Sequence, residues 1–270
     1  MHSVTEAGQL RRIFAMTASR DEILTYTNDL LDIPRFADYC PNGMQVIGAD
    51  QVETIATAVS CTMEVFTHAA DANADLLIVH HGLFWKGTPQ VINAQRRDRL
   101  AMLFDNDITL AGYHLPLDAH PALGNNALIR DGLALRADDR PFAVIGGQQI
   151  GVVGITEQDT PWDDFLQRVT ALVGGRAPLV LGDAPTHVRT VAICSGGAGD
   201  ELAAAAELGA DVMITGEPKE SSHADAVELG CTLIAAGHYA TETFGVRALG
   251  DHLAERFGVT HCAIDVENPV

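Results

Sequence analysis

Residues 74–81 read Ala-Asp-Leu-Leu-Ile-Val-His-His, and this stretch decides the fold. Its centre, 76–79, is short, apolar and partly β-branched, which is typical of a buried strand in a parallel sheet. Open α/β sheets bind ligands just beyond the carboxyl ends of such strands. His80 and His81 stand at that point, and neutral imidazole is a common ligand of Zn, Fe, Ni and Cu. The stretch predicts an α/β fold and indicates a metal site at the end of the strand.

The neighbouring segments extend this strand into a βαβαβ unit. Their hydrophobic patterns predict strands over 54–60 and 108–112 and helices over 63–72 and 93–106. This order favours a parallel sheet that is covered by helices.

The second half of the chain repeats the pattern. Residues 210–215, Ala-Asp-Val-Met-Ile-Thr, match residues 74–79 at an offset of 136 (210 − 74). Strands are expected over 188–194 and 232–236, with a short β region (142–155) and a helix (162–173) before them. We infer a weak internal duplication into two related α/β units with mostly parallel sheets. The first unit is expected over 1–125, joined by 237–270, and the second over 126–236.

A histidine precedes a carboxylate by four residues after the third strand of each unit. The pairs are His114 with Asp118 (118 − 114) and His238 with Glu242 (242 − 238). Positions i and i+4 share a helix face, so His238 and Glu242 can point at one ion. Pro116 disfavours a regular helix in the first copy, and we expect a turn to present Asp118 there.

Five residues are therefore candidate metal ligands, and they are too many for one tetrahedral catalytic ion with an open position. They suit two divalent ions bridged by carboxylates and water, and mixed imidazole and carboxylate ligands fit Zn, Fe, Mn, Ni or Co. Adjacent strand residues point in opposite directions, so the two neighbouring histidines can reach different ions. Two-metal centres generate hydroxide near neutral pH. The candidate ligands are His80, His81, Asp118, His238 and Glu242.

Simpler interpretations exist for each motif. A lone His-His pair is usually incidental, and a lone HxxxE motif on a helix is usually a solvated pair. Their coincidence at equivalent strand ends favours the metal site. His114 has two open interpretations: an acid–base residue beside the metals, or a structural histidine bonded to a backbone carbonyl. Asn125 is interpreted as a turn or cap residue, and Gly196–Gly199 as a tight turn without phosphate-binding spacing.

Composition excludes several classes of protein. The net charge of −19 disfavours binding to nucleic acid. The five cysteines are far apart and form no CxxC pair, which is typical of reduced, buried and structural thiols in a cytosolic protein. No stretch has the length of a membrane span or the pattern of a secretory signal, so we expect a cytoplasmic protein. Met16 offers a second start, which leaves open whether residues 1–15 belong to the native protein.

Several segments in order resemble a known family. They are Asp38–Val46, His80–Gly87, His114–Asn126, Thr215–Glu217 and Gly237–Glu242. The chain is similar over nearly its whole length to the YbgI branch of the Nif-three-like proteins, whose members are often called type 2 GTP cyclohydrolase I. Met44 replaces the usual leucine of one motif, and the large inserted domain of some relatives is absent.

The resemblance implies a two-domain α/β subunit in a toroidal homohexamer. It implies a dinuclear metal centre in the cleft between the domains, held by the same five ligands. The expected activity is that of a metal-dependent hydrolase acting on GTP or a similar small molecule, with His114 or a carboxylate moving protons. The alternative is a non-catalytic metal-binding or metal-delivery protein, or a ring scaffold that binds partners.

Overall fold

The computed structural model describes residues 17–270, so Met16 and the segment before it lie outside the described residues. The described chain forms two compact units. The first contains the described residues up to Leu30, then Tyr39–Tyr113 and Arg247–Val266. The second contains Leu31–Asp38, His114–Val246 and Glu267–Val270. Each unit therefore combines segments that are distant in the sequence.

The first unit is built on a five-stranded sheet with the order β13-β4-β5-β6-β2. Four of its strands run parallel and β2 pairs antiparallel with β6. The βαβαβ prediction is confirmed, and β5 extends through the histidine pair. The elements are α2 (Arg20–Leu30), β2 (Gly43–Val46), β4 (Thr54–Ser60), α3 (Met63–Asp71), β5 (Leu76–His81), α4 (Ala94–Asp105), β6 (Thr109–Gly112) and β13 (Thr260–Ala263), with β1 (Ala18–Ser19) pairing β3 (Gln51–Val52).

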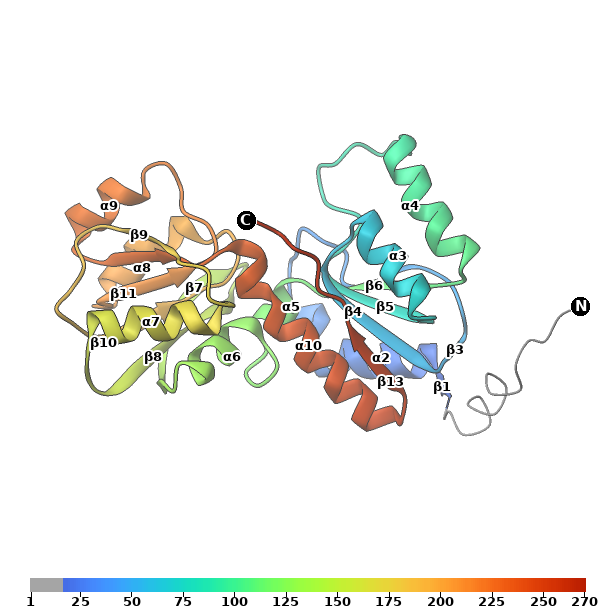
Figure 1. Cartoon of the computed structure of the whole chain (residues 1–270), viewed down its shortest axis with the longest axis horizontal. Coiled ribbons are helices and arrows are strands. Elements are labelled where there is room, and N and C mark those ends of the chain that lie inside the picture. The colour runs from blue at the N-terminus through green and yellow to red at the C-terminus, as the bar shows by residue number, and fades with distance from the viewer. Residues whose placement is uncertain (1–16) are drawn as a thin grey trace, which may run out of the picture. The chain divides into compact units, whose positions relative to one another are not determined.

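The face of this sheet that carries Leu77 and Val79 packs against α3 and α4, which lie side by side in Figure 1. Thr62 begins α3 by accepting a hydrogen bond from a backbone N–H, and Asn93 begins α4 in the same way. Because side chains alternate along a strand, His81 lies on the face of Leu77 and Val79 and His80 on the opposite face.

The second unit is built on a six-stranded sheet with the order β7-β8-β10-β11-β12-β9. Only β10, β11 and β12 run parallel; the other pairs are antiparallel. The expectation of a mostly parallel sheet is therefore wrong for this unit. The strands are β7 (Arg136–Ile145), β8 (Gln148–Pro161), β9 (Leu179–Leu181), β10 (His187–Ile193), β11 (Val212–Thr215) and β12 (Thr232–Ala235).

A long hairpin explains why the second sheet is not mostly parallel, contrary to expectation. Gly146 and Gly147 connect β7 to β8 with φ values of 58° and 82°. Two consecutive positive φ angles suit a two-residue turn whose twist matches antiparallel strands. The short β region expected over 142–155 is the centre of this longer hairpin.

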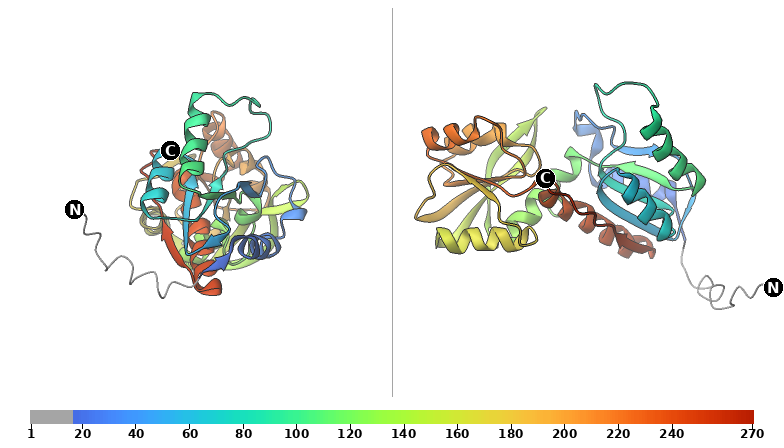
Figure 2. Two further views of the ribbon diagram at one scale, coloured as in Figure 1. Left: turned by 90° about the vertical axis from the view of Figure 1, so that its right-hand side faces the viewer. Right: turned by 45° about the horizontal axis from the view of Figure 1, so that its top comes forward.

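Helices cover both faces of the second sheet, as Figures 1 and 2 show. One core packs α6 (Asn125–Gly132) and α7 (Trp162–Leu172) against the sheet. The other packs α8 (Leu202–Glu207), which follows η2 (Gly199–Glu201), and α9 (Ser222–Leu229). The unit also contains η1 (Ile33–Arg35) and the short α5 (Leu115–Asp118). The last helix, α10 (His238–Phe257), begins in the second unit, and its residues from Arg247 belong to the first.

The duplication extends to individual hydrogen bonds. Asp75 Oδ2 accepts from the backbone N–H groups of Glu53 and Thr54, at 2.8 and 3.0 Å. Asp211 Oδ2 accepts from the N–H groups of residues 189 and 190, each at 2.8 Å. Both aspartates precede the middle strand of a βαβαβ unit and tie it to the strand before it.

Among the described residues, no helix has the length and apolar character needed to cross a membrane.

Candidate metal centre

Asp118 lies at the end of a single helical turn, α5. The backbone N–H groups of Leu117 and Asp118 donate to the carbonyl of His114 at 2.9 and 3.2 Å. A single turn presents Asp118, but this turn is helical, so the expectation that Pro116 disfavours regular helix here is wrong. Pro116 is compatible with the helix because it stands in the first turn, where a backbone N–H has no partner within the helix.

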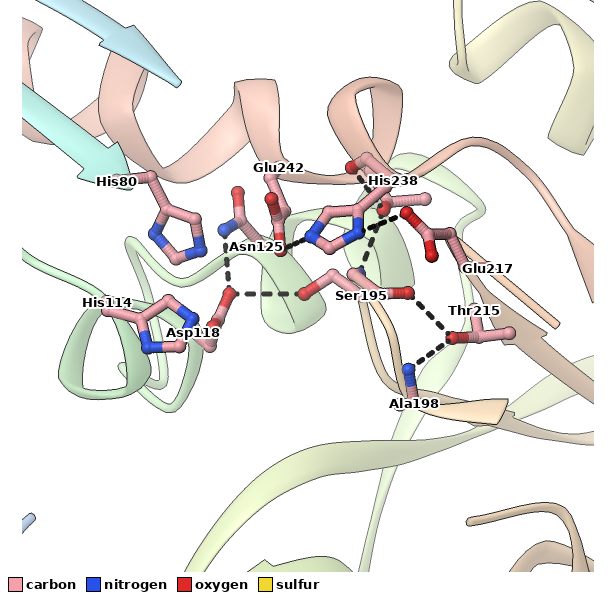
Figure 3. A network of polar contacts seen from close by, with 12 residues as sticks. His80, His114, Asp118, Asn125, Ser195, Ala198, Thr215, Glu217, His238 and Glu242 are labelled. Atoms are coloured by element: carbon pink, nitrogen blue, oxygen red, sulfur yellow. Dashed lines mark hydrogen bonds and ion pairs between the residues drawn. The ribbon is translucent and has the colours of Figure 1, made fainter. Parts of the chain in front are cut away.

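Two donors orient the carboxylate of Asp118 (Figure 3). Asn125 Nδ2 donates to Asp118 Oδ1 over 2.8 Å, and Ser195 Oγ donates to the same atom over 3.1 Å. Asn125 is in turn fixed because its Oδ1 accepts from the N–H of Gly245 at 2.7 Å. These two hydrogen bonds fix the orientation of the carboxylate of Asp118.

His238 and Glu242 share a face in the first turns of α10, as their spacing predicted. His238 Nε2 lies 3.2 Å from Glu242 Oε1. On the other side of the ring, His238 Nδ1 donates to Glu217 Oε1 over 2.7 Å. Because a carboxylate accepts this bond, Nδ1 carries a proton, and Nε2 is the nitrogen that would offer its lone pair to a metal once its own proton is displaced.

The charges around His238 change its pKa. Burial of the imidazole opposes protonation, but hydrogen bonds and negative charge from Glu242 and Glu217 outweigh it and raise the pKa of His238 to about 9. The same two carboxylates that favour a proton at this ring also favour a bound cation, which must displace that proton.

Two buried carboxylates meet in the second unit. Asp118 is 5% exposed and Glu242 is 2% exposed. Each offers an oxygen, and these two oxygens lie within 4.8 Å of each other. Two ionised carboxylates at this separation repel unless a proton or a cation lies near both. These residues, with His238, fit a metal ion by the chemistry of their donor atoms.

Gly196 leaves space beside the carboxylate of Glu242 and the imidazole of His238. A Cβ atom at this position would fall against Glu242 Oε1 and 3.2 Å from His238 Nε2. Two threonines hold the glycine: Gly196 N donates to Thr241 Oγ1 at 3.1 Å, and Thr215 Oγ1 donates to the Gly196 carbonyl at 3.1 Å. The chain bends at Gly196 and Gly197 and enters η2 at Gly199, and this bend lies against the candidate ligands Glu242 and His238.

His114 contacts a carboxylate. Its Nδ1 lies 2.8 Å from Asp38 Oδ1, and the N–H of Leu115 donates to Asp38 Oδ2 at 2.9 Å. The side chain of Asp38 is only 2% exposed. The acid–base interpretation of His114 therefore gains an orienting partner in this buried carboxylate.

His80 and His81 end β5 in the first unit. His80 is fully buried, and its Nδ1 lies 3.0 Å from the carbonyl of Tyr113. A carbonyl only accepts, so Nδ1 is the protonated nitrogen and Nε2 has the lone pair. The ring of His81 lies 4.9 Å from that of His80 and 5.8 Å from that of Trp85, measured between centroids.

Sequence reasoning missed the residues that orient these side chains. Asn125 is a fully buried bridge rather than a simple cap, and Ser195 donates to a candidate ligand. Glu217 had a usable signal, since it stands 136 residues after His81 (217 − 81), at the offset of the duplication. Asp38 had no signal beyond its place at the start of segment 38–46, which contributes to the family resemblance.

Comparison with known proteins identifies the family. The model of the Duf34/NIF3 (NGG1p interacting factor 3) family matches residues 18–269. The chain is 40% identical over 250 residues to a Neisseria meningitidis serogroup A protein named "GTP cyclohydrolase 1 type 2 homolog", covering 93% of this chain and 98% of that protein. A solved structure described as "protein ybgI, unknown function" aligns with a TM-score of 0.87 and 38% identity, covering 94% of this chain and all (100%) of that chain.

A second solved structure, TTHA1606 from Thermus thermophilus, aligns with a TM-score of 0.84 and 38% identity, over 94% of this chain and 100% of that chain. The matched region includes both units and every candidate ligand. The chain belongs to the Duf34/NIF3 family.

Proposed function

We propose that the protein is a dinuclear-metal-dependent hydrolase acting on a nucleotide or a similar small molecule, with GTP as the first candidate. Relatives that share about 40% identity are named GTP cyclohydrolase 1 type 2 homologs. The proposed ligands are Asp118, His238 and Glu242 from the second unit and His80 and His81 from the first. The proposed metals are two divalent ions among Zn, Fe, Mn, Ni and Co.

One observation carries the proposal: the buried carboxylates of Asp118 and Glu242 offer oxygens within 4.8 Å of each other, beside the imidazole of His238. Buried carboxylates are costly without a compensating cation. Hydrogen bonds from Asn125 and Ser195 hold Asp118 ready to accept one.

Divalent ions in such a centre would lower the pKa of water and polarise an electrophilic carbon or phosphorus. The chain's own residues would orient the ligands and move protons. Glu217 fixes the tautomer of His238 by accepting from Nδ1. His114, oriented at Nδ1 by Asp38, would take up a proton at Nε2 and return it to a leaving group.

Metal binding is tested before activity. Protein purified without added metal is analysed for Zn, Fe, Mn, Ni and Co by elemental analysis. Wild type should retain close to two ions per chain, and the Asp118→Asn variant should lose at least one of them. The matched control is Asp139→Asn, which changes an exposed aspartate of the same unit. Equal metal content in all three proteins would contradict the ligand assignment.

Activity is tested with the metal-loaded protein. GTP is incubated with wild type and with Glu242→Gln, and ring opening or hydrolysis is followed by absorbance and chromatography. The control, Glu255→Gln, changes an exposed residue of the same helix. No turnover above the Glu242→Gln background rejects GTP. If metal is retained and an unbiased metabolite screen also finds no turnover, the metal-delivery alternative is favoured.

We also propose that the chain assembles as a homohexameric ring, as the family resemblance implies. The first unit exposes Val91, Ile92 and Phe104, each more than half exposed at 66%, 63% and 59%. Exposed apolar side chains of this size favour association. Native mass spectrometry should give six chains, and a monomer at micromolar concentration would contradict the assembly.

A further inference from the structure

A cavity of about 300 Å³ lies in the second unit, beside the candidate metal centre. Residues 216–218 and 235–237 line it, and they follow or end the parallel strands β11 and β12. Residues 176–179 and 269–270 complete the lining. The carboxyl ends of parallel strands are where α/β sheets bind ligands, and this volume matches the small end of ligand pockets.

Most of the side chains that line this cavity are apolar, and several are stiff. Pro178, Pro218 and Pro269 have φ angles locked by their rings, and Ala235 and Ala236 bring only methyl groups. The C-terminal segment is fastened in place, because the N–H of residue 239 donates to the carbonyl of residue 270 at 3.0 Å. A largely apolar lining with few rotatable bonds suits the face of a planar ring, since little side-chain entropy is lost on binding.

Two charged side chains give the cavity polarity. Glu217 lines it, and one oxygen of this carboxylate accepts from His238 Nδ1. The side chain is 43% exposed, so the second oxygen can accept from a ligand. Arg176 is the one cation among the residues that line the cavity. Glu217 thus contacts a candidate metal ligand on one side and the cavity on the other.

We infer that this cavity binds the planar heterocyclic ring of the substrate, a purine-type base that donates an N–H to Glu217 and stacks on the proline and alanine walls. The inference rests on the proposed function, because the ring is that of the molecule on which the centre acts. Glu217 then has two tasks: it orients His238, and it recognises the base. Arg176 donates hydrogen bonds to the electron-rich or anionic edge of the bound molecule.

Guanosine is the first probe, because its base donates from a ring N–H and an adjacent amino group. Adenosine, whose ring nitrogen at the same edge only accepts, is the comparison. Binding to metal-loaded wild type is measured by isothermal titration calorimetry or ligand-observed NMR. Guanosine should bind, and adenosine should bind at least about tenfold more weakly, which corresponds to about 1.4 kcal/mol.

Leu179→Trp fills the cavity from its wall, and deletion of residues 269–270 opens it; neither alters a proposed metal ligand. Leu229→Trp is the matched control, because Leu229 is an exposed leucine of the same unit outside the cavity lining. Both cavity variants should weaken guanosine binding at least about tenfold and leave metal content unchanged. If Leu179→Trp does not fold, the deletion of residues 269–270 still tests whether guanosine binds in the cavity.

Three outcomes separate the inference from the proposed function. The inference is overturned if wild type does not bind guanosine. It is also overturned if wild type and both cavity variants bind guanosine with equal affinity. GTP turnover with the same KM in wild type and the cavity variants overturns it while the hydrolase proposal survives. Guanosine binding that is lost in both cavity variants, without any GTP turnover, supports the cavity and rejects GTP hydrolysis.

Discussion

His114 donates a hydrogen bond from Nδ1 to Asp38 Oδ1 over 2.8 Å, although 76 residues separate the two in the sequence. The second oxygen of Asp38 accepts from the backbone N–H of Leu115. The carboxylate therefore fixes both the ring and the start of the helical turn that ends at Asp118. One buried aspartate positions a candidate proton carrier and a candidate metal ligand.

Asp38→Asn should impair the site without unfolding the chain. An amide can present its NH₂ group to His114 and favour the other tautomer, with the proton on Nε2. Partners of this kind are worth about 10–100-fold in activity or metal affinity. NMR correlation of the imidazole nitrogens should show a protonated Nδ1 in wild type and a protonated Nε2 in the variant. Asp32→Asn, at an exposed position with a φ of 47°, is the control. An unchanged tautomer would show that Asp38 does not orient the ring.

Gly196→Ala should abolish metal binding. The new methyl group would fall against Glu242 Oε1 and close to His238 Nε2, the donor atoms of two proposed ligands. Gly230→Ala is a closely matched control: φ is 66° at Gly196 and 67° at Gly230, and a Cβ at Gly230 meets nothing within 4 Å. Both variants should lose about 1–2 kcal/mol of stability through the left-handed backbone. Elemental analysis should show lost metal in Gly196→Ala alone. Equal metal content in the two variants would remove Gly196 from the site.

Asn125→Ala should cost both stability and metal. The fully buried amide satisfies Asp118 on one side and the N–H of Gly245 on the other. Its loss leaves a buried donor and a buried acceptor less satisfied, at about 1–3 kcal/mol for each unsatisfied group. Urea unfolding measures the change in the free energy of unfolding. Asn106→Ala, on an exposed helix end, should change it little. Similar values for the two variants would show that the bridge contributes little.

The strand pattern was predictable because burial on both faces produces continuous apolar runs. Strand β4 begins and ends at the predicted residues, and the metal-ligand candidates followed from the strand ends. The hairpin was underestimated because β7 carries many charged residues, among them Arg136, Asp138 and Arg140, which hide a strand in a hydropathy pattern. Asp38 and Asn125 were not recognised because their partners are chosen by tertiary contacts that no local spacing records.

The cysteines should react slowly in the native protein. Burial, followed by the charge of Asp211, raises the pKa of Cys231 to about 12. Burial also raises the pKa of Cys61 and of Cys194 well above the usual range. The reactive thiolate of these three is therefore scarce at pH 8 and increases only as the pH rises toward the higher pKa.

Thiol titration at pH 8 should find one faster cysteine, Cys262, which is the partly exposed one among the five. The other four should react at the rate of unfolding. Cys262→Ser should remove the fast phase. A fast phase that persists in this variant would show that one of the buried thiols is accessible.

Substitution of Asp75 and of Asp211 tests whether the duplicated contact contributes equally to the free energy of unfolding in both units. Each accepts two backbone N–H groups of the preceding strand through a single carboxylate oxygen. Asp75→Ala and Asp211→Ala should each lower the free energy of unfolding by about 1–3 kcal/mol, because two N–H donors lose a charged acceptor. Asp105→Ala, at an exposed helix end, should change it by less than about 0.5 kcal/mol. If the two units depend equally on this contact, the two losses in the free energy of unfolding should agree within about 0.5 kcal/mol. They should also add in the double variant, since the two sites share no partner. A large loss at one position and none at the other would mean that only one unit still depends on this contact.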